Sequence, residues 1–141
     1  MKKSRAFILF GLALMASSFA EDIPDFITKG FDAYQKTGAE AAWKTWNVNY
    51  GSQQEAKKKI FLEQMSLAEK TYGAFIGTSL IKEVDASPFY REIHILVRFE
   101  KAPLFFTFQC YRPKDSWTIV GLSFSSKPEW MPGFEKHLKS S

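Results

Sequence analysis

The stretch FYREIHILVRFEKAPLFFTFQCYR, residues 89–112, decides the fold of this chain. Apolar and polar side chains alternate along both of its halves, and Ala102–Pro103 separates the halves. Alternation with a period of two is typical of strands that bury one face. A connection this short joins antiparallel neighbours. The stretch therefore predicts two adjacent antiparallel strands, 89–101 and 103–112, with one face turned towards a core.

Two further strands are predicted beside this pair, over residues 75–85 and 116–126. Turn residues lie at both joins, Ser87–Pro88 before the pair and Pro113–Asp115 after it. A register that sets Phe99 opposite Leu104, and Arg112 opposite Ser116, places the apolar sets of three strands on one face. This predicted core face consists of Phe89, Ile93, Ile95, Val97, Phe99, Leu104, Phe106, Phe108, Cys110, Val120, Leu122 and Phe124.

Before residue 75 the apolar residues recur with a helical period instead. Helices are predicted over 22–37, over 39–47, and from a capping box at Ser52–Glu55 to Tyr72, with Gly73 as the C-terminal cap. The predicted fold class is α+β, with three N-terminal helices packed on a four-stranded antiparallel sheet. It forms one domain over residues 21–126, and a C-terminal tail follows over 127–141.

The first 20 residues predict a cleavable signal peptide. Basic Lys2, Lys3 and Arg5 precede an apolar run, residues 6–16, and small residues lead to a cleavage site at Ala20/Glu21. A membrane span needs about 20 apolar residues, and this run has about half that number. It therefore predicts export to the periplasm or outside the cell without a stable membrane anchor. Cleavage leaves 16 basic and 15 acidic residues. This balance gives no reason to expect nucleic-acid binding.

The residue types that carry metal or nucleophile chemistry are sparse. Cys110 is the only cysteine, and its place among apolar strand residues predicts a buried, inert thiol. His94 and His137 are the only histidines and lie far apart in sequence. We therefore expect no metal site, no cofactor and no identifiable catalytic residue.

The other sheet face combines polar and aromatic side chains, which is typical of surfaces that bind partners. The register given above sets His94 opposite Gln109, with Glu92 and Arg98 on the same strand face. Together with two aromatic residues these form the candidate binding set: His94, Gln109, Arg98, Glu92, Tyr111 and Trp117. The alternative is ordinary cross-strand polar pairing on a half-exposed face.

Three helices followed by an antiparallel sheet resemble the nuclear transport factor 2-like superfamily. The stretch from Phe99 to Phe108, and its continuation from Tyr111 to Ser125, look like the sheet hairpin of small exported members that have no assigned function. The resemblance implies a curved sheet and a cone-like shape. Only residues 48–51 stand where many members carry an extra strand or hairpin, which indicates a shallow cone.

Members of that superfamily include dehydratases, isomerases and polyketide cyclases, and also non-enzymatic modules, so the fold does not select a function. The preferred hypothesis is an exported binding or dimerisation module, with a homodimer through the outer sheet face or a small apolar ligand. The alternative is a small-molecule enzyme of the dehydratase or isomerase type with a pocket between sheet and helices. His94 would be its base, and Asp85, Tyr34 and Tyr72 are further candidates.

Overall fold

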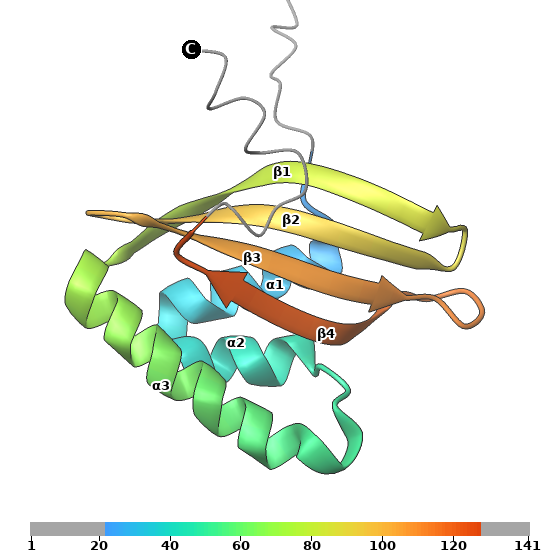
Figure 1. Cartoon of the computed structure of the whole chain (residues 1–141), viewed down its shortest axis with the longest axis horizontal. Helices are drawn as coiled ribbons and strands as arrows, with labels where there is room; N and C mark the ends of the chain where they lie inside the picture. The colour runs from blue at the N-terminus through green and yellow to red at the C-terminus, as the bar shows by residue number, and fades with distance from the viewer. Residues whose placement is uncertain (1–21, 128–141) are drawn as a thin grey trace, which may run out of the picture.

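The computed structural model describes residues 22–127 of the chain (Figure 1). The predicted signal peptide, its cleavage site and the tail beyond Lys127 lie outside the described residues. The elements are α1 (Asp25–Thr37), α2 (Ala39–Trp46), a short 3-10 turn (Gly51–Gln53), α3 (Gln54–Tyr72), β1 (Phe75–Ser87), β2 (Tyr90–Phe99), β3 (Pro103–Tyr111) and β4 (Thr118–Ser125). The strands form one antiparallel sheet in the order β1-β2-β3-β4. The predicted α+β class and all seven predicted helices and strands are confirmed.

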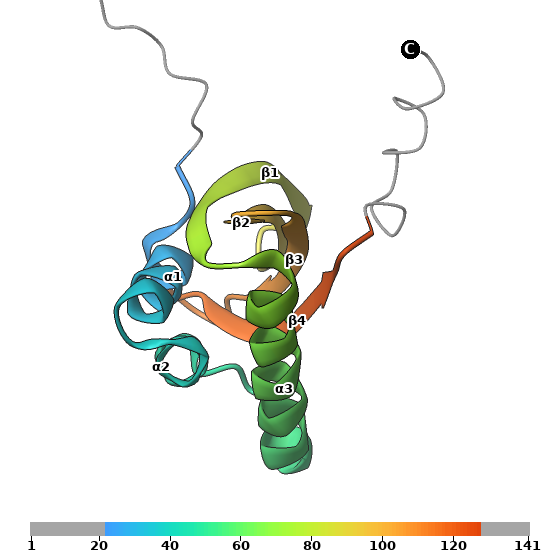
Figure 2. The ribbon, with the colours of Figure 1, turned by 90° about the vertical axis from the view of Figure 1, so that its left-hand side faces the viewer.

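The three helices lie on one side of a twisted sheet, as the end view in Figure 2 shows. Their apolar residues form one core with four residues of β2 and four of β3: Ile93, Ile95, Val97, Phe99, Leu104, Phe106, Phe108 and Cys110. Trp46 is central to it: its indole nitrogen donates to the Ile27 carbonyl at 2.9 Å, and its ring lies 5.1 Å from that of Phe108. Gly30 makes this approach possible, because a Cβ there would lie 1.9 Å from the Trp46 ring nitrogen.

The register between β2 and β3 differs from the predicted one by two residues. Val97, and not Phe99, lies opposite Leu104, and Thr107, and not Gln109, lies opposite His94. A slip of two residues leaves every side chain on its predicted face, since side chains alternate with a period of two. The predicted core residues of β2 and β3 are accordingly buried, and Cys110 is fully buried.

A bulge changes the first part of β4. Gln109 pairs with Gly121, but the next residue, Cys110, pairs with Ile119, so one β4 residue is extra. A bulge of this kind reverses the facing of the residues that precede it. Ile119, predicted on the outer face, is therefore in the core at 2 % exposure, whereas Val120, predicted in the core, is only half-buried.

Two local predictions were wrong. The capping box at Ser52 does not form, because Gly51–Gln53 is a 3-10 turn and no side chain caps α3; the Gln54 side chain instead accepts from the Tyr50 N–H at 3.0 Å. Phe89 lies in the turn between β1 and β2 and is 51 % exposed, although it was predicted in the core. The β1–β2 end of the sheet, which carries this turn, extends past the helices in Figure 1.

Candidate functional site

The sheet face turned away from the helices is called the outer face below. It carries the even-numbered residues of β2 and the odd-numbered residues of β3, among them Glu92, His94, Phe105, Thr107 and Gln109. Three of these side chains are buried, with exposures of 3 % for His94, 7 % for Phe105 and 4 % for Thr107. The centre of this face is therefore not an open surface, unlike its margins.

His94 is held between two side chains. Its Nδ1 lies 3.0 Å from the Thr107 hydroxyl, and its Nε2 lies 3.4 Å from the Glu92 carboxylate. A carboxylate can only accept, so Nε2 carries the proton and the Thr107 hydroxyl donates to Nδ1. Burial lowers the pKa of His94 below its usual 6.5; Glu92 opposes this shift and Lys82 of β1 adds to it. The imidazole is thus neutral near pH 7.

The order hydroxyl, imidazole, carboxylate is that of a hydrolytic triad, but the surroundings do not suit catalysis. The Thr107 hydroxyl is buried in the middle of a strand, where a substrate cannot reach it. The backbone around it belongs to a strand paired on both sides, so no pair of free N–H groups is available to stabilise an oxyanion. The arrangement is best explained as a satisfied polar pair within a covered sheet face.

The other candidate residues do not gather around His94. Gln109 lies opposite Glu92, and its side chain covers Gly121, where a Cβ would meet the amide oxygen at 2.2 Å. Arg98 reaches across β1, over Gly77. Tyr111 is at the margin of the sheet and is 44 % exposed. Gln109, Arg98 and Tyr111 thus lie on the strand faces that the sequence predicts, but the predicted His94–Gln109 pair does not exist.

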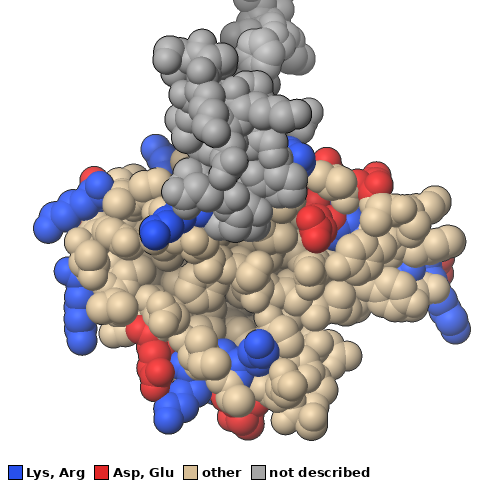
Figure 3. Space-filling view, in the orientation of Figure 1, with Lys and Arg blue, Asp and Glu red and all other residues tan. Residues whose placement is uncertain are grey.

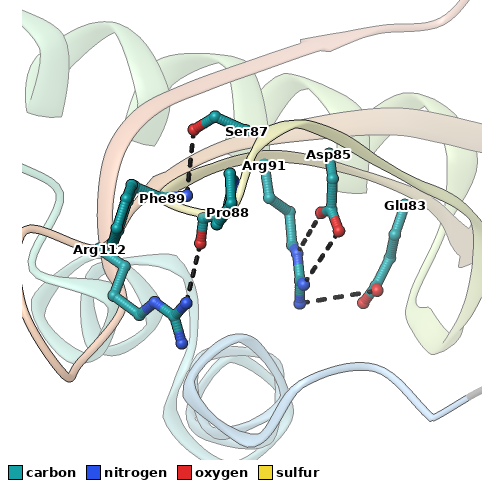
Figure 4. A network of polar contacts seen from close by, with 7 residues as sticks. All are labelled: Glu83, Asp85, Ser87, Pro88, Phe89, Arg91 and Arg112. Carbon is teal, nitrogen blue, oxygen red and sulfur yellow. Dashed lines mark hydrogen bonds and ion pairs between the residues drawn. The ribbon is translucent and has the colours of Figure 1, made fainter.

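Trp117 is not on the outer face at all. Its ring packs against the core, and the guanidinium groups of Arg91 and Arg112 lie 4.7 and 5.2 Å from its centre. Arg91 also pairs with Asp85 at 2.8 Å, and Arg112 donates to the Pro88 carbonyl at 2.9 Å (Figure 4). This cluster ties the β1–β2 turn to the β3–β4 loop. Asp85, a candidate acid for the enzyme hypothesis, belongs to this cluster through its ion pair with Arg91.

The space between the helices and the sheet does not form a pocket. Aromatic and aliphatic side chains fill it and leave no room for a water-sized sphere. Tyr34 is the ionisable residue on its border; it donates to the Glu69 carboxylate, and burial and this bond raise its pKa. Tyr34 and Glu69 also line a separate surface depression. Tyr72, the other tyrosine considered, lies instead beside a surface groove.

That groove, called the α3–β4 groove below, lies between the second half of α3 and the end of β4. It has a volume of about 360 Å³. Its lining residues are uncharged: Gln64, Leu67, Ala68, Thr71, Tyr72, Leu104, Phe124, Ser125 and Ser126. Leu67 is 58 % exposed on its wall. Figure 3 shows Lys and Arg mainly towards the rim of this view of the molecule, with uncharged surface between α3 and the end of β4.

The groove runs along a sheet edge that is only partly closed. The Asn49 N–H donates to the Ile119 carbonyl at 3.0 Å, and the Tyr50 hydroxyl bonds both backbone groups of Leu122. Backbone groups that point to one edge recur every second residue, so Phe124 directs its N–H and C=O to the same edge. Among residues 22–127 these two groups have no partner on that side. Sequence reasoning missed this site, since no local pattern marks an open edge.

Comparisons with known proteins leave the chain without a family assignment. No protein-family model matches it, and neither the curated proteins nor the solved structures provide a match. Among the described residues, no helix is long and apolar enough to cross a membrane, and no three metal-ligating side chains cluster. The function must therefore be argued from the surfaces themselves.

Proposed function

We propose that this chain is an exported, non-enzymatic binding module that takes up an extended polypeptide segment along the free edge of β4, in the α3–β4 groove. The observation that carries this proposal is that the N–H and C=O of Phe124, beside the exposed side chain of Leu67, have no partner among residues 22–127. A strand added to a sheet edge gains main-chain hydrogen bonds, and an adjacent groove accepts its alternate side chains.

Two features support a polypeptide as the ligand. Tyr50 ends the open part of the edge at Leu122, which leaves the part nearest the groove available. The lining is neutral and largely apolar, so it favours a segment with small or apolar side chains over a charged one. The filled space beneath the sheet, in contrast, gives no support to a dehydratase or isomerase that encloses its substrate.

Export and family belong to the same proposal. The basic, apolar and small-residue order of residues 1–20 supports a signal peptide and a periplasmic or secreted module. Three helices followed by a four-stranded antiparallel sheet support a place in the nuclear transport factor 2-like superfamily. An outer-face homodimer and a small apolar ligand are the alternatives to the polypeptide. The experiment below distinguishes binding of a small apolar ligand from binding of a peptide.

The proposal is tested with random 12-residue peptides displayed on phage and selected against the mature chain, residues 21–141. Selected peptides are synthesised, and their dissociation constants are measured by fluorescence anisotropy. Leu67→Glu places a charge on the groove wall and is expected to weaken binding at least about tenfold, or about 1.4 kcal/mol. Ile60→Glu is the matched control, because Ile60 lies two turns earlier on the same helix face, is 52 % exposed and does not line the groove.

Strand addition also requires main-chain hydrogen bonds, which a purely apolar contact does not. N-methylation of a bound peptide at alternate positions should abolish binding, whereas methylation at the intervening positions should leave it unchanged. The Phe124 amide should also become protected from hydrogen exchange. Equal binding by Leu67→Glu, or indifference to methylation at every position, would overturn the proposal. A groove that binds an apolar dye but none of the peptides would favour the small-ligand alternative.

A further inference from the structure

Two arginines contact the same ring at the β1–β2 end of the sheet, but only one of them has an anionic partner. The guanidinium carbons of Arg91 and Arg112 lie 4.7 and 5.2 Å from the centre of the Trp117 ring. Arg91 pairs with Asp85 at 2.8 Å and with Glu83 at 3.7 Å. Arg112 forms no ion pair with any carboxylate in the described part of the chain. Since a guanidinium is always charged in proteins, the charge of Arg112 has no direct partner there.

The Arg112 side chain is also held in place. Its Nη2 donates to the Pro88 carbonyl at 2.9 Å, and its guanidinium carbon lies 5.8 Å from the centre of the Phe89 ring. The Arg112 N–H donates to the Phe89 carbonyl at 2.8 Å. A mobile surface arginine loses rotamer freedom when it binds an anion, whereas these contacts restrict Arg112 beforehand. The arrangement therefore lowers the entropic cost of binding.

Most hydrogen-bond donors of the Arg112 side chain are unused. A guanidinium has five N–H donors, and the Arg112 side chain makes one hydrogen bond within residues 22–127, to Pro88. Figure 4 shows the bonded nitrogen directed at Pro88 and a second terminal nitrogen that points away from the other residues drawn. The Nε–H is buried and has no acceptor in the described structure. Buried donors without an acceptor are rare, and a bound ion is one explanation for them.

We infer that Arg112 binds the carboxylate of a ligand whose apolar part lies against Phe89. The guanidinium supplies charge-assisted hydrogen bonds. Phe89 is 51 % exposed, so its ring is available for the apolar contact. Arg112 and Phe89 are together called the Arg112 site below. It shares no residue with the lining of the α3–β4 groove and does not depend on peptide binding there.

The neighbouring charges favour a carboxylate over a phosphate. A carboxylate carries one negative charge and matches one unpaired guanidinium, whereas a phosphate monoester carries nearly two near pH 7. Arg91 is occupied by Asp85 and Glu83, so it does not supply a second free cation. These two carboxylates would also repel the additional charge. A small aromatic acid and the last residue of an apolar peptide both present the required chemistry, and the experiment below distinguishes them.

Titration of the mature chain, residues 21–141, with 3-phenylpropanoate tests the inference, with ¹H–¹⁵N spectra as the readout. The Nε–H resonance of Arg112 and the amide resonance of Phe89 should shift and saturate. The neutral 3-phenylpropanamide should bind at least about tenfold more weakly, because it keeps the ring and loses the charge. Equal binding of acid and amide would overturn the inference. Shifts at Leu67 and Phe124, without shifts at the Arg112 site, would overturn it as well.

Variants test the residue itself. Arg112→Gln should weaken binding of 3-phenylpropanoate at least about tenfold, and Arg112→Lys, which keeps the charge, should weaken it less. Arg98→Gln is the matched control, because Arg98 lies opposite Pro103, at the other end of β2 and β3. It should bind like the parent chain. Equal affinities of Arg112→Gln and Arg98→Gln would overturn the inference. Circular dichroism verifies folding, and if Arg112→Gln does not fold, the comparison of acid with amide on the parent chain decides.

A third comparison identifies the source of the carboxylate. A tripeptide of two alanines and a C-terminal phenylalanine is titrated with a free and with an amidated C-terminus. Binding of the free form at least about tenfold more tightly than 3-phenylpropanoate would assign the site to a peptide end, and the reverse order to a small acid. Tighter binding of phenyl phosphate than of 3-phenylpropanoate would overturn the choice of a carboxylate. None of these results depends on the α3–β4 groove, so this inference and the proposed function can fail separately.

Discussion

The Tyr50 hydroxyl accepts from the Leu122 N–H at 2.7 Å and donates to the Leu122 carbonyl at 2.8 Å. A single side chain thus replaces the neighbouring strand that β4 lacks at this position. Exposed strand edges invite pairing with other chains, and natural proteins usually cover or interrupt them. Tyr50 covers the edge at Leu122, and among residues 22–127 the part of the edge without a partner begins at Phe124. This division decides where a segment from another protein could bind.

Tyr50→Phe should destabilise the fold by about 1–3 kcal/mol, because both backbone groups of Leu122 lose a partner in a partly buried place. Urea unfolding monitored by circular dichroism measures the change. Tyr111→Phe is the control, since Tyr111 is 44 % exposed and should change stability by less than about 0.5 kcal/mol. Tyr50→Phe should also self-associate more readily in sedimentation experiments, because its open edge is longer. Equal stability of the two variants would show that the Tyr50 hydroxyl is not needed there.

Trp117→Ala should lower stability by about 2 kcal/mol, since it removes a ring that packs on the core and contacts the guanidinium groups of Arg91 and Arg112. Tyr111→Ala should cost less than about 1 kcal/mol. Thermal and urea unfolding of both variants provide the comparison. If Trp117 instead lay on the outer face, as the sequence predicts, neither variant should lose much stability.

Stability should fall as the pH drops below about 6.5 in a manner that depends on His94. Burial lowers the pKa of folded His94 below 6.5, so the unfolded chain binds the proton more tightly than the folded one. This contribution to stability is present above pH 6.5 and is lost as the pH falls below it. His94→Gln should remove that part of the slope in urea titrations.

The imidazole itself can be followed by NMR across the same pH range. Glu92→Gln should lower the pKa of His94 further, because the Glu92 carboxylate favours the charged imidazole. A titration of folded His94 above 6.5 would contradict both statements.

Cys110 should be inert in the folded protein. It is fully buried, and burial raises the pKa of its thiol to about 12, so almost no thiolate exists near neutral pH. Iodoacetamide at pH 8 should modify the thiol only in urea, as measured by mass spectrometry of the intact chain. Modification at the same rate with and without urea would show that β3 is accessible at Cys110.

Gly30→Ala should destabilise the chain by about 1–3 kcal/mol or more, because the new methyl group would overlap the Trp46 indole and disturb its bond to Ile27. Asp32→Ala, an exposed position on the same helix, should change stability by less than about 0.5 kcal/mol. Thermal unfolding of the two variants measures the difference. A Gly30→Ala variant as stable as the parent would mean that α1 and α2 can separate without cost.

The amino-acid sequence by itself determined the element order and most of the buried faces. Helical spacing before residue 75 and alternation after it reflect one physical demand, that each element turns its apolar side to a common core. Ile93, Ile95, Phe106 and Phe108 are buried as that pattern predicts. The same demand placed Cys110 in the core. It also identified His94 as part of the opposite face.

Only the tertiary structure decided which residues meet. A slip of two residues keeps all faces unchanged, so alternation cannot choose between Gln109 and Thr107 as the neighbour of His94. The bulge that turned Trp117 towards the core depends on the pairing of β3 with β4, and no local signal marks it. Tyr50 and Leu122 are 72 residues apart in sequence, and their bond exists because the α2–α3 connection lies against the edge of β4. Side-chain period is a local property of a strand, whereas register and edge closure arise from contacts between distant segments.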